Sequence, residues 1–160
     1  MTVDTTHLHV REATRADLEM IVAFNAALAA ETEHKTLDLQ VLKRGVERAL
    51  ADRNRGLYFI AEFDRTVVGQ TLVTFEWSDW RAAWFWWLQS VYVRPEFRGR
   101  GVFKALYRHI QERCRAEPDT CGLRLYVEKS NRRALETYLR LGLAQAPYAM
   151  LEVDWSTAAR

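Results

Sequence analysis

The chain has 160 residues, of which 49% are hydrophobic, and this suits one globular domain with a buried core. Its 23 Lys and Arg against 21 Asp and Glu leave a formal net charge of +2, too small to indicate a nucleic-acid-binding protein. The two cysteines, Cys114 and Cys121, have neither the number nor the spacing of a disulfide framework or a zinc site, so no metal is expected.

The first half of the chain predicts a strand, two helices and three further strands. "LHVRE" (8–12) is the first strand, and Thr14 with Asp17 three positions later is typical of a helix start, here for a helix to about residue 28. A second helix is expected from about Asp38 to Leu50. The β-rich runs 56–63 and 66–77, separated by Asp64 and Arg65, predict an antiparallel hairpin, and 84–93 is the next strand.

The second half continues the alternation after Pro95, which ends the strand. The apolar period predicts a helix over 102–115, followed by a strand at 123–127, a helix over 131–141 stopped by Gly142, and a last strand at 148–155. The order β-α-α-β-β-β-α-β-α-β indicates the α/β class, with a mixed central sheet flanked by helices. No repeat or linker divides it, so a single domain over 1–160 is expected.

Location is predicted from what the sequence lacks. No apolar run approaches the 18 or so residues of a membrane span, and the start has no basic and apolar blocks of a secretory signal. We therefore expect a cytoplasmic protein with no membrane contact.

The stretch "EFRGRGVFKAL" (96–106) joins a strand to a helix and is rich in glycine and basic residues. The first N–H groups of a helix lack internal partners and carry partial positive charge, and glycine lets a ligand approach the backbone. These features predict a phosphate or pyrophosphate site. The P-loop pattern and the dinucleotide fingerprint are both absent.

This stretch resembles the (Q/R)xxGx(G/A) signature of the GNAT N-acetyltransferases, with Phe103 in place of the last Gly or Ala. The helical period places Phe103 in the core. The resemblance implies the GNAT acyl-CoA N-acyltransferase fold and acetyl-CoA as cosubstrate, its pyrophosphate on the loop amides and its pantetheine arm along the fourth strand, which also supplies the oxyanion donor. The cofactor-binding residues it implies are Val91, Tyr92, Val93, Arg98, Gly99, Arg100, Gly101, Val102, Phe103, Lys104 and Asn131.

A second stretch, "NRRALETYLRLGL", resembles the NxxAxxxYxxxGF signature of the same family, with Leu143 where Phe is usual. Asn131 is equally a helix N-cap, and Tyr138 on periodicity alone is equally a core aromatic. With the resemblance, Tyr138 is the expected general acid. A tyrosine hydroxyl keeps its proton to about pH 10, above the pKa of about 8.5 of a thiol, so it suits protonation of a departing thiolate.

The general base is less clear in the sequence. Some members of the family carry a glutamate eleven residues before the Arg or Gln of the first signature, and that position here is Trp87. Glu76, Asp79 and Glu128 lie near predicted strand ends, and Glu76 is the first candidate, acting through water. Gln89 can order a water but cannot accept its proton.

Five tryptophans crowd the third and fourth strands: Trp77, Trp80, Trp84, Trp86 and Trp87. They form either core or dimer surface, or an aromatic wall for an organic amine. Simple alternation puts Trp87, Gln89, Val91 and Val93 on one face, and Trp86, Leu88, Ser90 and Tyr92 on the other. The residues expected to face the substrate are Glu31, Trp77, Trp87 and Gln89.

The sequence therefore predicts an enzyme that transfers acetyl from acetyl-CoA to a primary amine of a small molecule, peptide or protein. The alternative is a catalytically silent CoA-binding sensor or partner-binding module, suggested by Trp87 at the usual base position. Nucleic-acid binding by the Arg-rich helix from Arg98 to Arg115 is disfavoured by the acidic Glu96 and Glu112 and by the lack of a recognition motif. A homodimer is left open.

Overall fold

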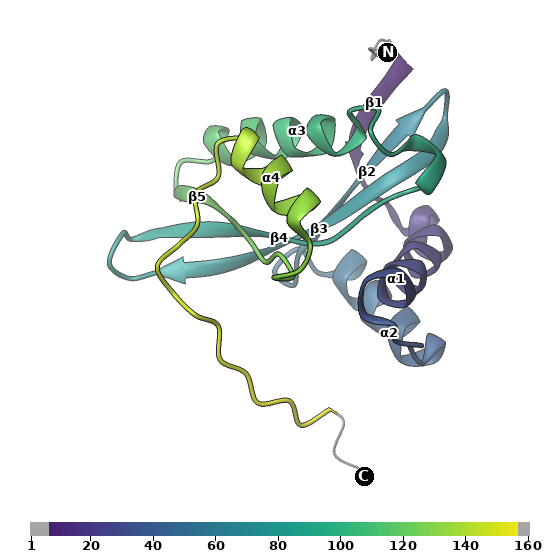
Figure 1. Cartoon of the computed structure of the whole chain (residues 1–160), viewed down its shortest axis with the longest axis horizontal. Coiled ribbons are helices and arrows are strands. Elements are labelled where there is room, and N and C mark those ends of the chain that lie inside the picture. The colour runs from purple at the N-terminus through teal and green to yellow at the C-terminus, as the bar shows by residue number, and fades with distance from the viewer. Residues whose placement is uncertain (1–6, 157–160) are drawn as a thin grey trace. The chain divides into compact units, whose positions relative to one another are not determined.

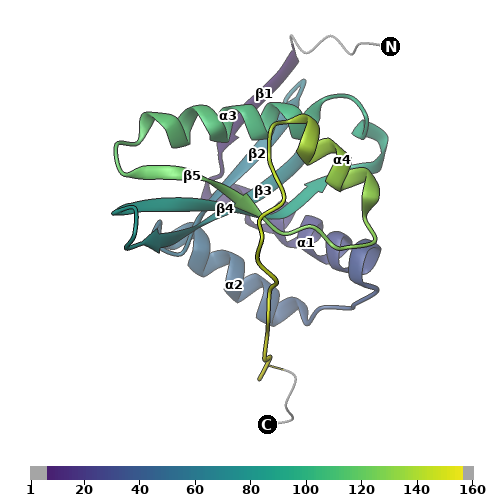
Figure 2. The ribbon, with the colours of Figure 1, turned by 60° about the vertical axis from the view of Figure 1, so that its left-hand side comes forward.

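A computed structural model describes residues 7–156, shown as ribbons in Figures 1 and 2. The chain forms two compact units, one up to Tyr126 and one from Val127, which are described separately, and the single domain over 1–160 stays a prediction. The first unit contains β1 (Leu8–Glu12), a 3₁₀ helix (Arg15–Asp17), α1 (Leu18–Glu33), α2 (Leu39–Ala51), β2 (Leu57–Phe63), β3 (Thr66–Ser78), β4 (Ala83–Val93), a 3₁₀ helix (Pro95–Phe97), α3 (Val102–Ala116) and β5 (Thr120–Leu125). The second contains α4 (Arg132–Arg140).

The first unit is a five-stranded sheet in the order β1-β2-β3-β4-β5 between two layers of helix. β1 to β4 are antiparallel to their neighbours and β5 is parallel to β4, so the sheet is mixed as predicted. Helix α3 covers one face, and α1 and α2 cover the other (Figure 2). Leu106 and Ile110 of α3 are fully buried against the sheet, as the helical period predicted.

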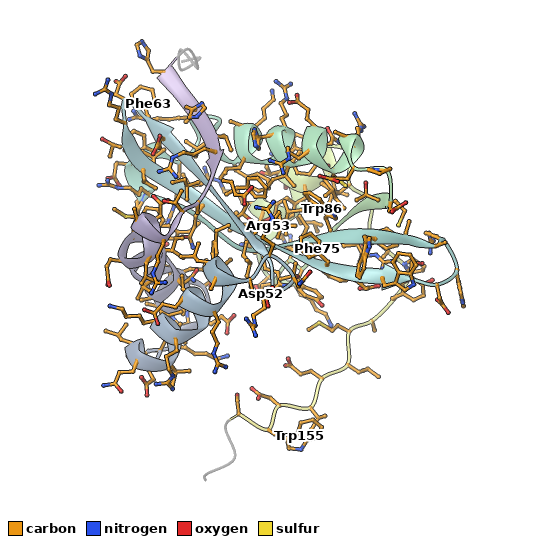
Figure 3. The ribbon with its side chains drawn as sticks, turned by 180° about the vertical axis from the view of Figure 1, so that it is seen from behind. Asp52, Arg53, Phe63, Phe75, Trp86 and Trp155 are labelled. Carbon is orange, nitrogen blue, oxygen red and sulfur yellow. The ribbon has the colours of Figure 1, made fainter. Side chains whose placement is uncertain are left out.

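The β2–β3 and β3–β4 hairpins are each stabilised by identifiable local features. Asp64 and Arg65 take φ values of 47° and 65°, the left-handed pair that a type I′ turn requires, so the predicted β2–β3 turn is confirmed. The far ends of β3 and β4 form a long hairpin that extends away from α1 and α2 (Figure 1). On it Phe75 packs edge to face on the buried Trp86, with 5.5 Å between ring centroids (Figure 3).

The alternation predicted for β4 breaks at a β-bulge. Leu72 pairs with Gln89 and Gln70 pairs with Tyr92, so Ser90 and Val91 together oppose the single residue Thr71. Ser90 takes a left-handed φ of 49°. Gln89 and Tyr92 therefore share a face, which corrects the prediction that they lie on opposite faces.

The predicted last strand at 148–155 is wrong. These residues form no strand, and Trp155 lies in the extended segment after α4 (Figure 3). The apolar side chains of the segment are exposed: Tyr148, Met150, Leu151, Val153 and Trp155. Aromatic and β-branched residues favour a strand only where a neighbouring strand pairs with them, and the sheet of the described residues ends at β5.

Two negative findings apply to residues 7–156. No helix among them is long and apolar enough to cross a membrane. Nor do three His, Cys, Asp or Glu side chains of this part of the chain gather into a group able to hold a metal ion.

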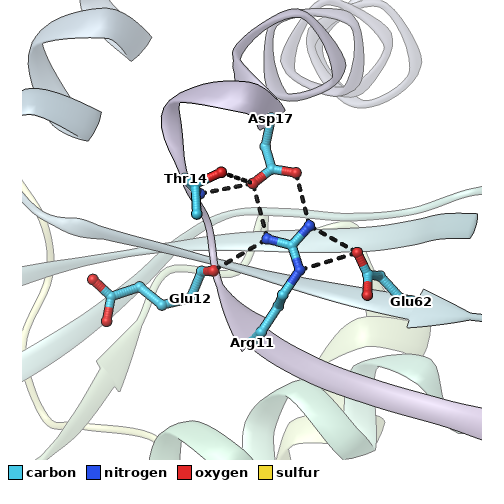
Figure 4. Close-up of polar contacts among 5 residues, drawn as sticks. All are labelled: Arg11, Glu12, Thr14, Asp17 and Glu62. Atoms are coloured by element: carbon cyan, nitrogen blue, oxygen red, sulfur yellow. Dashed lines mark hydrogen bonds and ion pairs between the residues drawn. The ribbon is translucent and has the colours of Figure 1, made fainter. Parts of the chain in front are cut away.

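One charged cluster fixes the start of α1 on the sheet (Figure 4). Arg11 of β1 donates from Nη1 and Nη2 to the two oxygens of Asp17, each at 2.9 Å, and from Nη2 to Glu62 of β2 at 2.7 Å. The Thr14 backbone N–H donates to Asp17 Oδ2 at 2.7 Å, which confirms the predicted capping pair. Hydrogen bonding from Arg11 holds the pKa of the buried Asp17 carboxyl below its ordinary value.

We expect Asp17→Asn to lower the free energy of unfolding by about 2 kcal/mol at pH 7, because it removes the anion facing a partly buried guanidinium. Since the pKa of Asp17 is lower in the folded state, its contribution is complete above the ordinary value of 3.8 and is lost as the pH falls through the folded value. Denaturant melts at pH 7 and pH 3 measure both effects. The exposed Asp119→Asn is the control, and an equal loss in both variants at pH 7 would contradict this role for Asp17.

Candidate functional site

The start of α3 is formed by glycines and has no side-chain cap. Gly99 and Gly101 take left-handed φ values of 74° and 85°, and Gly101 occupies the N-cap without any side-chain cap. The Ala105 N–H donates to Gly101 O at 3.0 Å, which closes the first turn. A helix start without a side-chain cap, here at Gly101, attracts anions.

The arginines around this loop are not equivalent. Arg94 pairs with Glu96, and Arg98 donates to Glu31 Oε2 of α1, each at 2.6 Å. Arg98 also donates from Nε to the Val93 carbonyl at 2.8 Å, so it braces the loop against β4 and α1.

Arg100 and Lys104 supply the side-chain charge on the outside of the loop. Both are exposed, and the Arg100 guanidinium lies 5.6 Å from the centroid of the Phe97 ring. An anion at the start of α3 would therefore meet backbone donors first and these two cations second.

Glu31 contacts this loop. Besides its pair with Arg98, it accepts from the Tyr92 hydroxyl at 3.3 Å, and burial together with the Glu31 charge raises the pKa of Tyr92. Its role in binding a substrate cation stays a prediction, since its observed partners belong to the expected phosphate site.

Phe103, the residue that departs from the family signature, is half-buried. Its ring centroid lies 6.2 Å from that of the buried Tyr107, one turn along α3. The predicted face is thus correct, but the side chain is not fully enclosed in the core.

Next to the loop, β4 has an edge that β5 does not cover. The parallel pairing runs from Trp84 to Leu88 and then ends. Beyond it, the Arg94 N–H donates to Val68 of β3 at 2.9 Å, so by alternation the polar groups of the preceding Val93 point to the open side. Arg98 takes the Val93 carbonyl there. An extended ligand can add to such an edge as another strand does.

A polar and aromatic cluster lies on the α1 and α2 face where β4 and β5 diverge. Glu76 of β3 accepts from Trp87 Nε1 and from Arg124 Nη1, both at 2.6 Å. The Trp87 ring packs on that of Tyr126 at a tilt of 35°, with 4.4 Å between centroids. Gln89 donates to Thr74 Oγ1 at 2.5 Å. The structure thus brings together the predicted residues Glu76, Trp87 and Gln89.

Two members of this cluster, Arg124 and Tyr126, were missed by the sequence analysis. Arg124 lies on β5 and Tyr126 directly follows it, and the parallel register of β5 with β4 is not visible in a sequence. The remaining predicted substrate residue, Trp77, packs on Trp84 of the hairpin with 5.0 Å between centroids and is 49% exposed.

The second unit carries the other predicted residues. Asn131 caps α4, because its Oδ1 accepts a hydrogen bond from the Ala134 N–H at 3.1 Å. Its predicted role as a helix N-cap is therefore confirmed, and its role in cofactor binding stays a prediction. The helix ends as predicted at Gly142 (φ 92°), and the Leu143 N–H donates to Tyr138 O at 3.1 Å. Burial raises the pKa of the Tyr138 hydroxyl above its ordinary value.

Solved structures share this architecture. A possible acetyltransferase from Clostridium difficile 630 is 43% identical and superposes with a TM-score of 0.86, covering 92% of this chain and 97% of that one. A predicted acetyltransferase from Clostridium acetobutylicum, solved with acetyl-CoA, has a TM-score of 0.72 at 18% identity and covers 92% of this chain and 96% of that one, which supports the fold.

Sequence comparisons agree. The thialysine N-epsilon-acetyltransferase of Bos taurus is 34% identical over 76 residues, 48% of this chain, and the match spans only 44% of that relative. The model of the acetyltransferase (GNAT) family matches residues 23–143, which include both signatures recognised in the sequence. This chain therefore belongs to the GNAT family of acetyltransferases.

Proposed function

We propose that the protein transfers the acetyl group of acetyl-CoA directly to a primary amine. The observation that carries this proposal is the uncapped start of α3 at Gly101, directly after a strand whose outer edge β5 leaves open. An anion site continuous with an open strand edge suits a ligand with phosphates at one end and an extended amide arm.

In this proposal the backbone from Gly99 to Lys104 holds the pyrophosphate, with Arg100 and Lys104 adding charge. Val91 and Val93 hydrogen-bond the pantetheine arm, and the arm then runs back along β4 toward the bulge at Ser90. The thioester would thus lie near the divergence of β4 and β5, beside Gln89. One of the outward N–H groups of this edge serves as the oxyanion donor.

The chemistry needs one nucleophile and two proton transfers. The neutral amine nitrogen attacks the thioester carbon, the C–N bond forms, and the C–S bond breaks as the tetrahedral intermediate collapses. The amine loses one proton to water or a base, and the thiolate takes one proton from Tyr138. Because burial raises the pKa of Tyr138, its hydroxyl is protonated throughout the neutral range and can donate.

Glu76 is the proposed base, acting through a water. Trp87 stands where some family members carry a glutamate, yet its indole N–H contacts the Glu76 carboxylate at 2.6 Å. A carboxylate is thus present in this region, and each of its oxygens retains a second lone pair for a water. This observation favours the enzyme over the silent sensor that Trp87 alone suggested.

The acceptor is proposed to be a small molecule, and the name of the Bos taurus relative makes thialysine the first compound to test. Purified protein is incubated with acetyl-CoA and a panel of amines, and released CoA thiol is measured. Turnover of one or more amines supports the proposal. A CoA-dependent rise in melting temperature with no thiol release from any amine would instead identify the sensor.

We expect Arg100→Ala to weaken CoA binding about five-fold, because one cation near the pyrophosphate is lost at an exposed site. Calorimetry with CoA and with pantetheine, which lacks the phosphates, measures this. Only CoA should lose affinity, and the exposed Arg115→Ala of α3 should affect neither. Equal weakening of both ligands would show that Arg100 does not act on the phosphates.

Removing the Tyr138 hydroxyl is the direct test of the acid. Tyr138→Phe should lower kcat about 100-fold, since general acid catalysis typically contributes a factor of that order, while the affinity for CoA is retained. Tyr148→Phe is the matched control, because Tyr148 is 77% exposed. An unchanged kcat in Tyr138→Phe would remove the acid role.

The pH dependence of kcat/KM also tests the role of Tyr138 as the general acid. An alkylamine with a pKa near 10.4 becomes a better nucleophile as the pH rises, and Tyr138, with a pKa raised above 10, still holds its proton. We therefore expect kcat/KM to rise steadily from pH 6.5 to pH 9.5. A fall that begins below pH 9 in this profile would contradict Tyr138 as the acid.

A further inference from the structure

The pair between Glu76 and Arg124 is the most distinctive charged feature that acetyl transfer itself leaves unexplained. We infer that Arg124 binds a carboxylate of the acceptor, so that the acceptor is an amine that also carries a carboxylate, such as an amino acid. This inference rests on the proposed function and adds the substrate class to it.

The position of Arg124 is that of an acceptor-binding residue. It pairs in register with Trp87, one step before the last β4–β5 pair, Leu88 with Leu125. Beyond that pair β4 has its open edge, where the proposed thioester lies. Helix α3 covers the other face of β4 and β5, so an acceptor reaches the divergence from the face that carries Arg124.

The guanidinium is fixed in a way that leaves donors available. It lies 3.6 Å from the centroid of the Phe85 ring, and its Nη1 donates to Glu76 Oε1 at 2.6 Å. A guanidinium has five N–H donors in one plane, and the contact with Glu76 uses one of them. The others suit bidentate binding of a second carboxylate.

The pair is also accessible to a ligand. The side chains of Arg124 and Glu76 are 30% and 44% exposed, and ion pairs in such surroundings contribute little to stability. A ligand with both charges can therefore engage the two residues without a large cost.

The arrangement of charge discriminates between classes of amine. A polyamine meets the positive charge of Arg124, whereas an amino acid can place its carboxylate on Arg124 and an ammonium near Glu76. The rings of Trp87 and Tyr126, which contact each other, form an adjacent wall for the carbon chain and for cation–π contact.

The test compares L-lysine with L-lysinamide, in which a neutral amide replaces the carboxylate. Acetylation of the ε-amine is compared, because the amide lowers the pKa of the neighbouring α-amine but leaves that of the ε-amine nearly unchanged. We expect the wild-type kcat/KM to be about ten-fold higher for lysine, as for one charge-assisted contact. In Arg124→Gln this ratio should fall to about one, mainly through a higher KM for lysine, because a binding contact is lost.

Controls separate this role from damage to the fold. Arg115→Gln, an exposed arginine on α3, should keep the ten-fold preference, and Arg124→Lys, which keeps the charge without the fork, should give an intermediate ratio. A CoA-dependent thermal shift reports that each variant is folded. The ratio of kcat/KM for lysine to that for lysinamide in the wild type tests the inference even if a variant fails to fold.

Each outcome decides the matter. Equal use of lysine and lysinamide by the wild type overturns the inference and leaves acetyl transfer standing. A preference for lysine that persists in Arg124→Gln overturns the assignment to Arg124. Absence of turnover with every amine overturns the proposed function and this inference with it.

Discussion

The functional region depends on the point where β4 loses one of its two neighbours. Up to Leu88 its backbone pairs with β3 on one side and β5 on the other, and beyond it only β3 remains. The bulge at Ser90 and Val91 falls just after this point, and a bulge bends a strand and increases its twist. Backbone N–H and C=O groups at an uncovered strand edge lack hydrogen-bond partners from a neighbouring strand. Arg98 supplies one for the Val93 carbonyl, and the rest of the edge suits an extended ligand.

The same strand leads into the anion site, so the two halves of the proposed cofactor site have a fixed spacing along the chain. Arg98 connects them, since it holds both the Val93 carbonyl and Glu31 of α1. Its charge is thereby largely balanced within the protein. In the proposed site the phosphates would be attracted by the start of α3 and by the exposed Arg100 and Lys104. Gly101, which has no side chain, leaves the N-terminus of that helix without a side-chain cap.

Features that depend on residues close in sequence were predicted correctly. The turn at Asp64 and Arg65, the capping pair of Thr14 with Asp17 and the apolar face of α3 each follow from local chemistry. The failures involve partners distant in sequence. Propensity proposed a strand at 148–155 that no other strand pairs with, and alternation does not reveal a bulge at a serine. The contact between Arg124 and Glu76 depends on the parallel register of β5 with β4. The two strands are separated in the chain by α3, so neither strand's sequence reveals that register.

Trp87 shows why a single position is a poor guide to catalytic competence. Read by itself, a tryptophan at the usual position of a base indicates lost function. In the sheet, however, Thr74 pairs with Trp87, and Glu76 is the next residue of β3 on the same face, so the two side chains are diagonal neighbours across the strand pair. The indole N–H then fixes a carboxylate that comes from β3 instead of β4. Arg124 of β5 donates to the same carboxylate. The position of the Glu76 carboxylate, and so its access to an acceptor, therefore depends on residues of three strands.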